Sequence, residues 1–234
     1  MELWIPITIA AAFLQNIRSA LQKSLKGQLS DAGATFVRFS FGFPVAIVYL
    51  FALSYGLGSE LPRANPSFAG FLLLGGTAQI LATFLLIRLF SLRNFAVGTA
   101  YSKTEPIQAA IFGSVLLSEG LSPGGGLAVL ITTVGVFSIS VARSDISWIG
   151  LRASLTGRPA LIGLGSGALF GMAAVAYRGA SLALGGPGFL IPAAFTLACV
   201  TLYQTAVMIP YLAWREPGQL GAVLGQWRPS AWVG

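Results

Sequence analysis

Long apolar runs separated by short polar segments form the dominant pattern of this chain. A helix needs about 20 mostly apolar residues to cross a bilayer. Seven runs meet this condition, at residues 3–22, 34–55, 67–89, 95–118, 122–142, 161–183 and 188–213. Turn-forming residues join several of them, as in "GSELPRANPS" and "LGGPG". The pattern predicts an all-α integral membrane protein with about seven transmembrane helices.

Composition supports this interpretation. The 234 residues are 55% hydrophobic and 9% charged, and the mean hydropathy is +0.79, whereas a soluble domain carries about 25% charged residues. The 29 glycines suit closely packed membrane helices. The chain has no histidine and a single cysteine, Cys199, which excludes a disulfide within the chain and argues against a zinc or haem site. We therefore expect no metal ion and no cofactor.

Basic residues in the loops predict an orientation. If the N-terminus lies outside the cell, the outer loops hold only Arg63. The inner loops then hold Lys23, Lys26, Arg88, Arg93, Arg143, Arg152, Arg158, Arg215 and Arg228. This bias favours an outside N-terminus, because basic residues concentrate in cytoplasmic loops. We interpret these charges as topology signals rather than as a nucleic-acid surface, so no nucleic-acid partner is expected.

A weak internal repeat divides the chain into three parts. At an offset of 155 residues, "FLQNIRSALQKS" (13–24) lies over "ALFGMAAVAYRG" (168–179). Five predicted spans precede the second copy, and this odd number inverts its orientation, as in many secondary transporters. We therefore divide the chain into a first five-helix repeat (1–142), a basic amphipathic linker at the membrane surface (143–160) and the start of a second repeat (161–234).

The end of the sequence suggests further helices. "RPSAWVG" (228–234) resembles "NPSFAGF" (65–71), which opens the third predicted span. The chain therefore stops where an eighth span would begin. We expect a C-terminally truncated form of a ten-helix protein built of two inverted five-helix repeats; the alternative is that seven spans are complete.

Two charged residues interrupt the fourth predicted span. In "YSKTEPIQ" (101–108), Lys103 and Glu105 lie near the middle of the bilayer, where a charge costs about 2.5–3.5 kcal/mol or more. On a straight helix they face apart, since two residues correspond to roughly 200°. Glu105 then shares a polar and aromatic face with Tyr101 and Gln108, which suggests a cavity wall. Pro106 predicts a bend in the helix beside this cavity.

Other polar residues within the spans offer partners for these charges. Arg38, on the second span, either pairs with Glu105 as a structural lock or faces the same cavity. We expect Asn16 and Arg18, on the first span, to line that cavity, although Arg18 is also close enough to its helix end to reach the interface. The predicted substrate-binding or coupling residues are Glu105, Lys103, Tyr101, Gln108, Arg38 and Asn16, with Pro106 at the bend.

Three segments carry a family resemblance. Residues 96–122 resemble the drug/metabolite transporter superfamily, particularly its EamA-like branch, in small residues, a mid-helix proline and a closing Leu-x-Glu. The matching positions are Ala96, Ala100, Pro106, Ala109, Leu117 and Glu119. "VRFSFGFP" (37–44) and "GLAVLITTVGVFSIS" (126–140) are similar to its second and fifth spans. The resemblance implies ten spans in two inverted repeats and transport of small organic solutes. It also implies cytoplasmic termini, in conflict with the loop charges.

Together these patterns predict a secondary transporter that moves a small organic metabolite or drug by alternating access, driven by a proton or solute gradient. Arg38 and Lys103 favour an anionic or zwitterionic solute, whereas Glu105 favours a cation or a proton. The alternatives are a membrane-embedded enzyme acting on a lipid-linked substrate, and a non-transporting assembly subunit. We predict that the protein is not an enzyme, lies in the inner membrane of a bacterium, and contacts lipid, solute and protons. A homodimer is left open.

Overall fold

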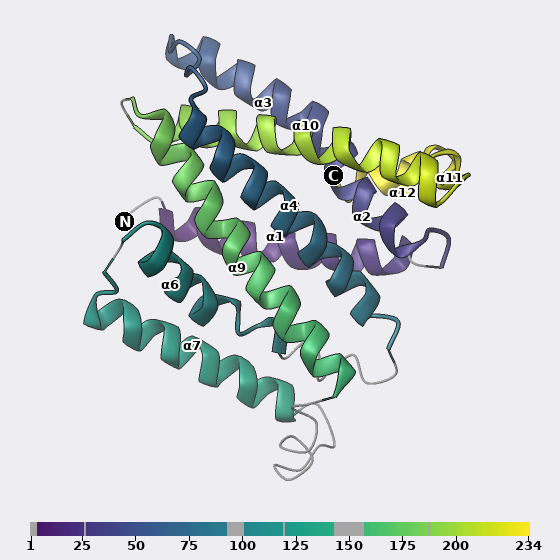
Figure 1. Cartoon of the computed structure of the whole chain (residues 1–234), viewed down its shortest axis with the longest axis horizontal. Coiled ribbons are helices and arrows are strands. Elements are labelled where there is room, and N and C mark those ends of the chain that lie inside the picture. The colour runs from purple at the N-terminus through teal and green to yellow at the C-terminus, as the bar shows by residue number, and fades with distance from the viewer. Residues whose placement is uncertain (1–3, 26, 93–100, 119, 143–156, 187) are drawn as a thin grey trace.

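The computed structural model describes residues 4–25, 27–92, 101–118, 120–142, 157–186 and 188–234. Within these ranges the secondary structure is helical, with no strand (Figure 1). The helices are α1 (Trp4–Leu25), α2 (Asp31–Ser40), α3 (Gly42–Leu57), α4 (Pro66–Leu89), α6 (Glu105–Leu116), α7 (Pro123–Ala142), α9 (Arg158–Leu184), α10 (Leu190–Arg215), α11 (Gln219–Gly225) and α12 (Trp227–Ala231).

Four helical segments are long and apolar enough to cross a membrane. They are Asp31–Leu57, Pro66–Leu89, Arg158–Leu184 and Leu190–Arg215. The protein is therefore all-α with a composition that fits a multi-pass membrane protein. The other predicted spans correspond to α1, to α6 with the residues before it, and to α7, and these do not reach the same length and hydropathy within the described residues. The seven-span and inverted-repeat predictions stay predictions.

Local sequence signals explain where two of the long segments begin. Ser30 precedes α2, and its hydroxyl oxygen accepts a hydrogen bond from the Gly33 N–H at 2.9 Å. Asn65 precedes α4, and its side-chain oxygen accepts a bond from the Phe68 N–H at 2.8 Å. Both residues satisfy N–H groups that the first helical turn leaves without a partner.

The second predicted span is two helices rather than one. α2 ends at Ser40 and α3 begins at Gly42, so the helix is interrupted at Phe41, although the backbone of Phe41 stays in the helical region. Pro44 follows within the first turn of α3. A proline lacks the N–H that would bond to the carbonyl four residues earlier, so the sequence weakens helical pairing at this point.

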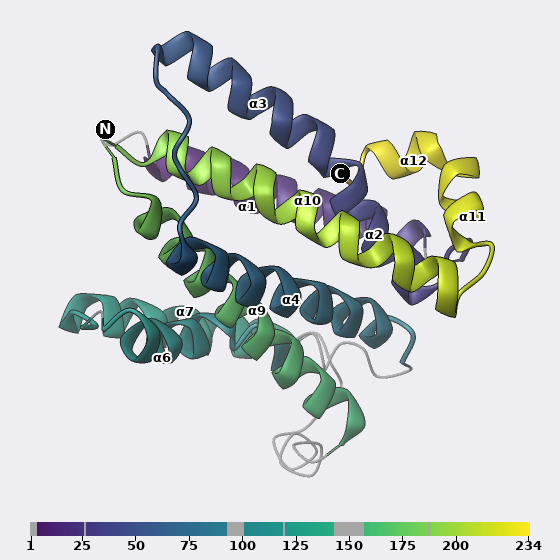
Figure 2. The same ribbon diagram turned by 45° about the horizontal axis from the view of Figure 1, so that its top comes forward.

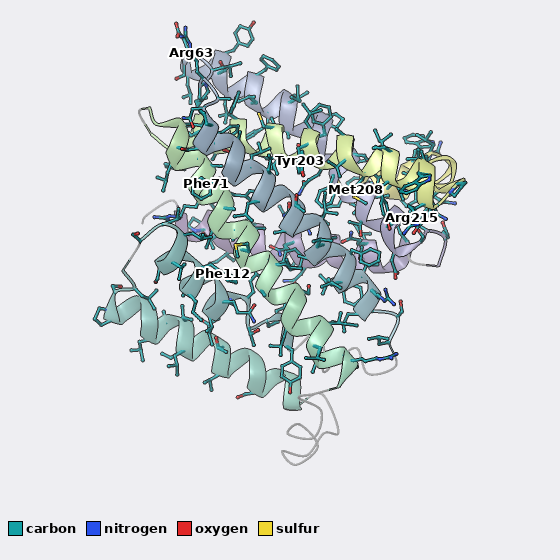
Figure 3. All side chains as sticks on the ribbon, in the orientation of Figure 1. Arg63, Phe71, Phe112, Tyr203, Met208 and Arg215 are labelled. Atoms are coloured by element: carbon teal, nitrogen blue, oxygen red, sulfur yellow. The ribbon has the colours of Figure 1, made fainter. Side chains whose placement is uncertain are left out.

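The helices form two groups around α4. α4 packs along α9, α9 packs on α6, and α7 lies on the outer side of α6 (Figure 1). α10 contacts α2, α3, α4 and α9, and α1 and α10 lie on the same side of α4 (Figure 2). Tyr203 of α10 reaches α4, where its hydroxyl lies 2.8 Å from the Thr77 hydroxyl (Figure 3). This arrangement encloses the middle of α4 with three other helices.

The α1–α2 loop is held against the end of α10. The Ser30 N–H donates to the Gln219 side-chain oxygen at 3.0 Å, and the Ser30 hydroxyl bonds to the Glu216 carboxylate. Beside these bonds lies the larger apolar core, whose buried members are Leu25, Leu29, Ala32, Ala34, Phe36, Val37, Phe39, Ile87, Met208, Leu212, Val223 and Val233. The core fixes α2, and therefore Arg38, relative to α4 and α10.

Candidate functional site

The fourth predicted span contains a turn next to its charged residues. Residues 101–102 are helical, Lys103 and Thr104 form a turn, and α6 begins at Glu105. The Tyr101 carbonyl accepts bonds from both the N–H (3.1 Å) and the hydroxyl (2.7 Å) of Thr104. Pro106 lies in the first turn of α6, where a proline is tolerated because its missing N–H has no helical partner. The chain therefore changes direction just before Pro106 rather than at it.

Two glycines of α9 hold this turn in place. A Cβ added at Gly167 would lie 2.8 Å from the Ser102 carbonyl oxygen, and one added at Gly171 would lie 2.9 Å from the Ala109 nitrogen. Real Cβ contacts do not reach such distances, so only glycine permits this approach. These two glycines therefore serve helix packing, and their packing positions the segment that carries Lys103 and Glu105.

A cavity of about 280 Å³ opens beside the turn. α1, α2, α4, α9 and the segment 101–105 all contribute to it. We call it the charged cavity, because four of its lining side chains are charged. Its lining residues are Gln15, Asn16, Arg18, Gln22, Arg38, Leu86, Phe90, Ser102, Lys103, Glu105 and Phe170.

The turn changes the relation between Lys103 and Glu105. A straight helix would direct them to different faces, but both line the charged cavity because the helix stops between them. Lys103 is exposed and Glu105 is half-buried. The expectation that the two charges face apart is therefore corrected, and the cause is the irregular backbone at residues 103–104.

Arg38 reaches the same cavity from α2. One of its terminal nitrogens donates to the Thr83 hydroxyl of α4 at 3.2 Å. Its guanidinium carbon lies 5.8 Å from the ring centroids of both Phe39 and Phe170, a distance at which a cation and an aromatic face attract. Among the residues that the structure describes, Arg38 and Glu105 form no ion pair. The alternative that Arg38 and Glu105 pair as a structural lock is therefore not supported by a direct bond between them.

One face of α1 supplies further polar lining. Asn16 and Arg18 both line the charged cavity, which is one of the two positions expected for Arg18. Gln22 lies one turn after Arg18, and its side-chain nitrogen donates to the Ala34 carbonyl of α2 at 2.9 Å. This bond fixes the polar face of α1 against α2, next to Arg38.

Tyr101 and Gln108 are not among the lining residues of the charged cavity. Tyr101 is 2% exposed and packs inside the bundle. The Gln108 side-chain nitrogen donates to the Thr104 hydroxyl at 2.9 Å, and its oxygen is buried without a hydrogen-bond partner among the described residues. These two predicted site residues therefore lie outside the cavity lining, and their contacts with Thr104 stabilise the turn.

Two more cavities continue from the charged one. A second cavity of about 320 Å³ is also lined by Arg18 and Arg38, together with Gln79 of α4 and Thr201 of α10. A third cavity, of about 360 Å³, shares Gln79 and Thr201 with the second. The second cavity therefore shares Arg18 and Arg38 with the charged cavity, and Gln79 and Thr201 with the third.

An uncharged polar cluster contributes Gln79 to the second and third cavities and Tyr177 to the third. The Gln79 side-chain oxygen accepts bonds from the Tyr177 hydroxyl at 2.7 Å and from the Gln204 side-chain nitrogen at 2.8 Å. The same two donors reach the carbonyls of Gly75 (3.1 Å) and Gly76 (3.2 Å). Gln79, Tyr177 and Gln204, which we call the uncharged cluster, therefore join α4, α9 and α10. Their position inside predicted spans is the signal that could have identified them from the sequence.

Neither the side chains nor the comparisons assign a chemistry to this site. Within the described ranges, no three His, Cys, Asp or Glu residues come together as a metal site. Comparisons of the chain with protein-family models, curated proteins and solved structures find no match. The resemblance of residues 96–122 to the drug/metabolite transporters therefore stays a prediction from motifs, and the function has to be argued from the cavities.

Proposed function

We propose that the protein is a secondary transporter that moves a small organic solute across the membrane, with the charged cavity as its binding site. One observation carries the proposal. Charged side chains from α1, α2 and the turn before α6 converge on one cavity inside a bundle of apolar helices. Charges at this depth are costly and usually mark a substrate or ion pathway.

The broken helix at the site also supports this function. Transporters commonly build their binding sites where a spanning helix is interrupted, because the interruption directs polar groups into a protected cavity. Here the interruption is the turn at Lys103–Thr104, and Glu105 begins the next helix. Two neighbouring cavities share lining residues with this site or with each other, which is compatible with a path for a solute.

Three variants test this function: Glu105→Gln, Arg38→Gln and the double variant. The purified chain is reconstituted in liposomes, and counterflow is measured for a panel of amino acids, carboxylates, sugars and sugar phosphates. A hydrogen bond to a charged group contributes about 1.5–3 kcal/mol, so transport by each single variant should fall about ten- to a hundredfold. The melting temperature should stay close to that of the unchanged protein.

A structural role for the two charges gives the opposite result. If Arg38 and Glu105 only neutralise each other, each single variant loses about 3–5 kcal/mol of stability, as for a broken buried pair. The double variant then regains both stability and transport. That recovery, or the absence of counterflow for every solute in the panel, would contradict the proposal.

A further inference from the structure

The charges around the cavity are unequal in number. Among the described lining residues, Arg18, Arg38 and Lys103 are cationic and Glu105 is the one carboxylate, so these four side chains carry a formal net charge of +2. We infer that the solute is a small organic anion, and that its carboxylate or phosphate group binds between Arg18, Arg38 and Lys103. This inference rests on the proposed function. It selects an anionic solute, where the sequence left both an anionic and a cationic solute open.

Arg38 has the geometry of an anion receptor. Phe39 and Phe170 contact its guanidinium, and Thr83 accepts a bond from one terminal nitrogen. These contacts fix the side chain, and within the described residues the structure shows no direct salt bridge between Arg38 and a carboxylate, although Glu105 attracts it at longer range. A fixed guanidinium presents parallel N–H groups that match the two oxygens of a carboxylate or phosphate. The arginine is therefore held in a suitable position before an anion arrives.

The same arginines serve two neighbouring cavities. Arg18 and Arg38 line both the charged cavity and the second cavity. An anion that moves from one to the other stays within reach of both guanidinium groups. Lys103 and Glu105, in contrast, line only the charged cavity. The two arginines are therefore the side chains that would stay near the anionic group in both cavities.

The size of the charged cavity limits the solute. Its volume is about 280 Å³. This is at the lower limit of the about 300–1,000 Å³ typical of pockets for drug-sized ligands. The volume therefore favours a small metabolite.

A charge-selective labelling experiment tests the inference without requiring transport. Asn16 is exposed and lines the charged cavity, so Asn16→Cys places a reporter thiol there, in a background with Cys199→Ser. In non-ionic detergent, its reaction rates with an anionic sulfonatoethyl and a cationic trimethylammonioethyl methanethiosulfonate are compared. Each rate is divided by the rate with free cysteine. A net charge of +2 within a Debye length should favour the anionic reagent about tenfold.

Charge-removing variants assign this preference to the cavity. Arg38→Gln and Lys103→Gln should each lower the normalised rate ratio about threefold. Lys103 is exposed, so its variant keeps the experiment informative if Arg38→Gln fails to fold. Arg63→Gln is the matched control: it removes the same charge from the exposed α3–α4 loop (Figure 3) and should leave the ratio unchanged.

Protection of the thiol identifies the anionic group. Protection by succinate indicates carboxylates, and protection by glycerol phosphate indicates phosphate monoesters. A normalised ratio at or below one, failure of both anions to protect, or equal protection by uncharged glycerol would overturn the inference. Counterflow measured on the protein that keeps Asn16 separates the two proposals, because Asn16 is itself a predicted binding residue. Anion selectivity without movement of any solute contradicts the transporter and leaves the anion site standing.

Discussion

The charged cavity and the uncharged cluster are two polar regions inside the helix bundle, and both contact α4. They differ in the hydrogen-bond partners of their polar groups. In the uncharged cluster, the Tyr177 hydroxyl and the Gln204 side-chain nitrogen bond to Gln79 and to backbone carbonyls. Only the Gln204 side-chain oxygen lacks a partner among the described residues. In the charged cavity, Arg38 bonds to one hydroxyl and otherwise faces rings and open volume.

The difference separates two uses of polar residues in a membrane protein. Groups that bond to one another hold helices together, as hydrogen bonds between membrane helices do. Charges that face a cavity without a bonded opposite charge contribute little to stability, and they remain available to a solute. We therefore expect substitutions in the uncharged cluster to change stability, and substitutions around the charged cavity to change binding and transport.

The largest effect on stability is expected for Gln204→Ala. This side chain is fully buried, and its nitrogen reaches Gly76, Gln79 and Tyr177 on two other helices. Removing it leaves a cavity and unpaired acceptors, with a loss of about 2–4 kcal/mol in the free energy of unfolding. Thermal unfolding in detergent measures the loss, and counterflow per folded molecule should be unchanged. An unchanged melting temperature would contradict the proposal that the uncharged cluster stabilises the fold and the charged cavity does not.

A smaller effect is expected for Tyr177→Phe, which keeps the ring and removes the hydroxyl. The hydroxyl bonds to Gln79 and Gly75 of α4 and accepts from Gln204. Interhelical hydrogen bonds in membrane proteins contribute about 0.6 kcal/mol on average and up to about 1.7, so we expect a loss of about 1 kcal/mol. The control is Tyr55→Phe on α3, because Tyr55 is 87% exposed and its substitution should leave the melting temperature unchanged.

The smallest effect on stability is expected for Thr83→Val, at the boundary between the regions. Thr83 lies one turn after Gln79 on α4 and accepts the bond from Arg38. The loss should be below about 1 kcal/mol, whereas the released guanidinium should weaken anion selectivity at the Asn16→Cys reporter. If the regions are independent, the stability losses of Thr83→Val and Tyr177→Phe add within about 0.5 kcal/mol. Strong non-additivity would show that they act as one unit.

Much of the helical architecture could be predicted from the sequence. The four segments long enough to cross a membrane coincide with predicted spans, because apolar runs of about 20 residues have few alternatives to a membrane helix. Ser30, Asn65 and the glycines of α9 have the structural roles that their residue types indicate. The predicted orientation, truncation and inverted repeat stay predictions, and most of the linker at 143–160 lies outside the described residues.

The candidate site could be predicted only in part. Charged residues inside apolar runs identified Lys103, Glu105 and Arg38 as unusual, because such charges are costly in a membrane. Which of their neighbours share the cavity could not be derived, since Pro106 indicated a bend but not the turn that precedes it at residues 103–104. The turn at Lys103–Thr104 changes which side chains face the cavity. Lys103 therefore lines the cavity together with Glu105, whereas Tyr101 is buried.

The sequence was sufficient to predict a set of apolar helices with a few charged residues that are costly in a membrane. This was possible because composition and the length of apolar runs govern local helix formation. The tertiary structure alone decided which charges meet. Arg38 lies near Phe170, and Gln79 meets Tyr177 and Gln204, only because α2, α9 and α10 pack around α4. Side chains separated by about 100 residues come together through helix packing, which no local pattern specifies. The difference between the hydrogen-bonded uncharged cluster and the charged cavity therefore depends on the tertiary fold.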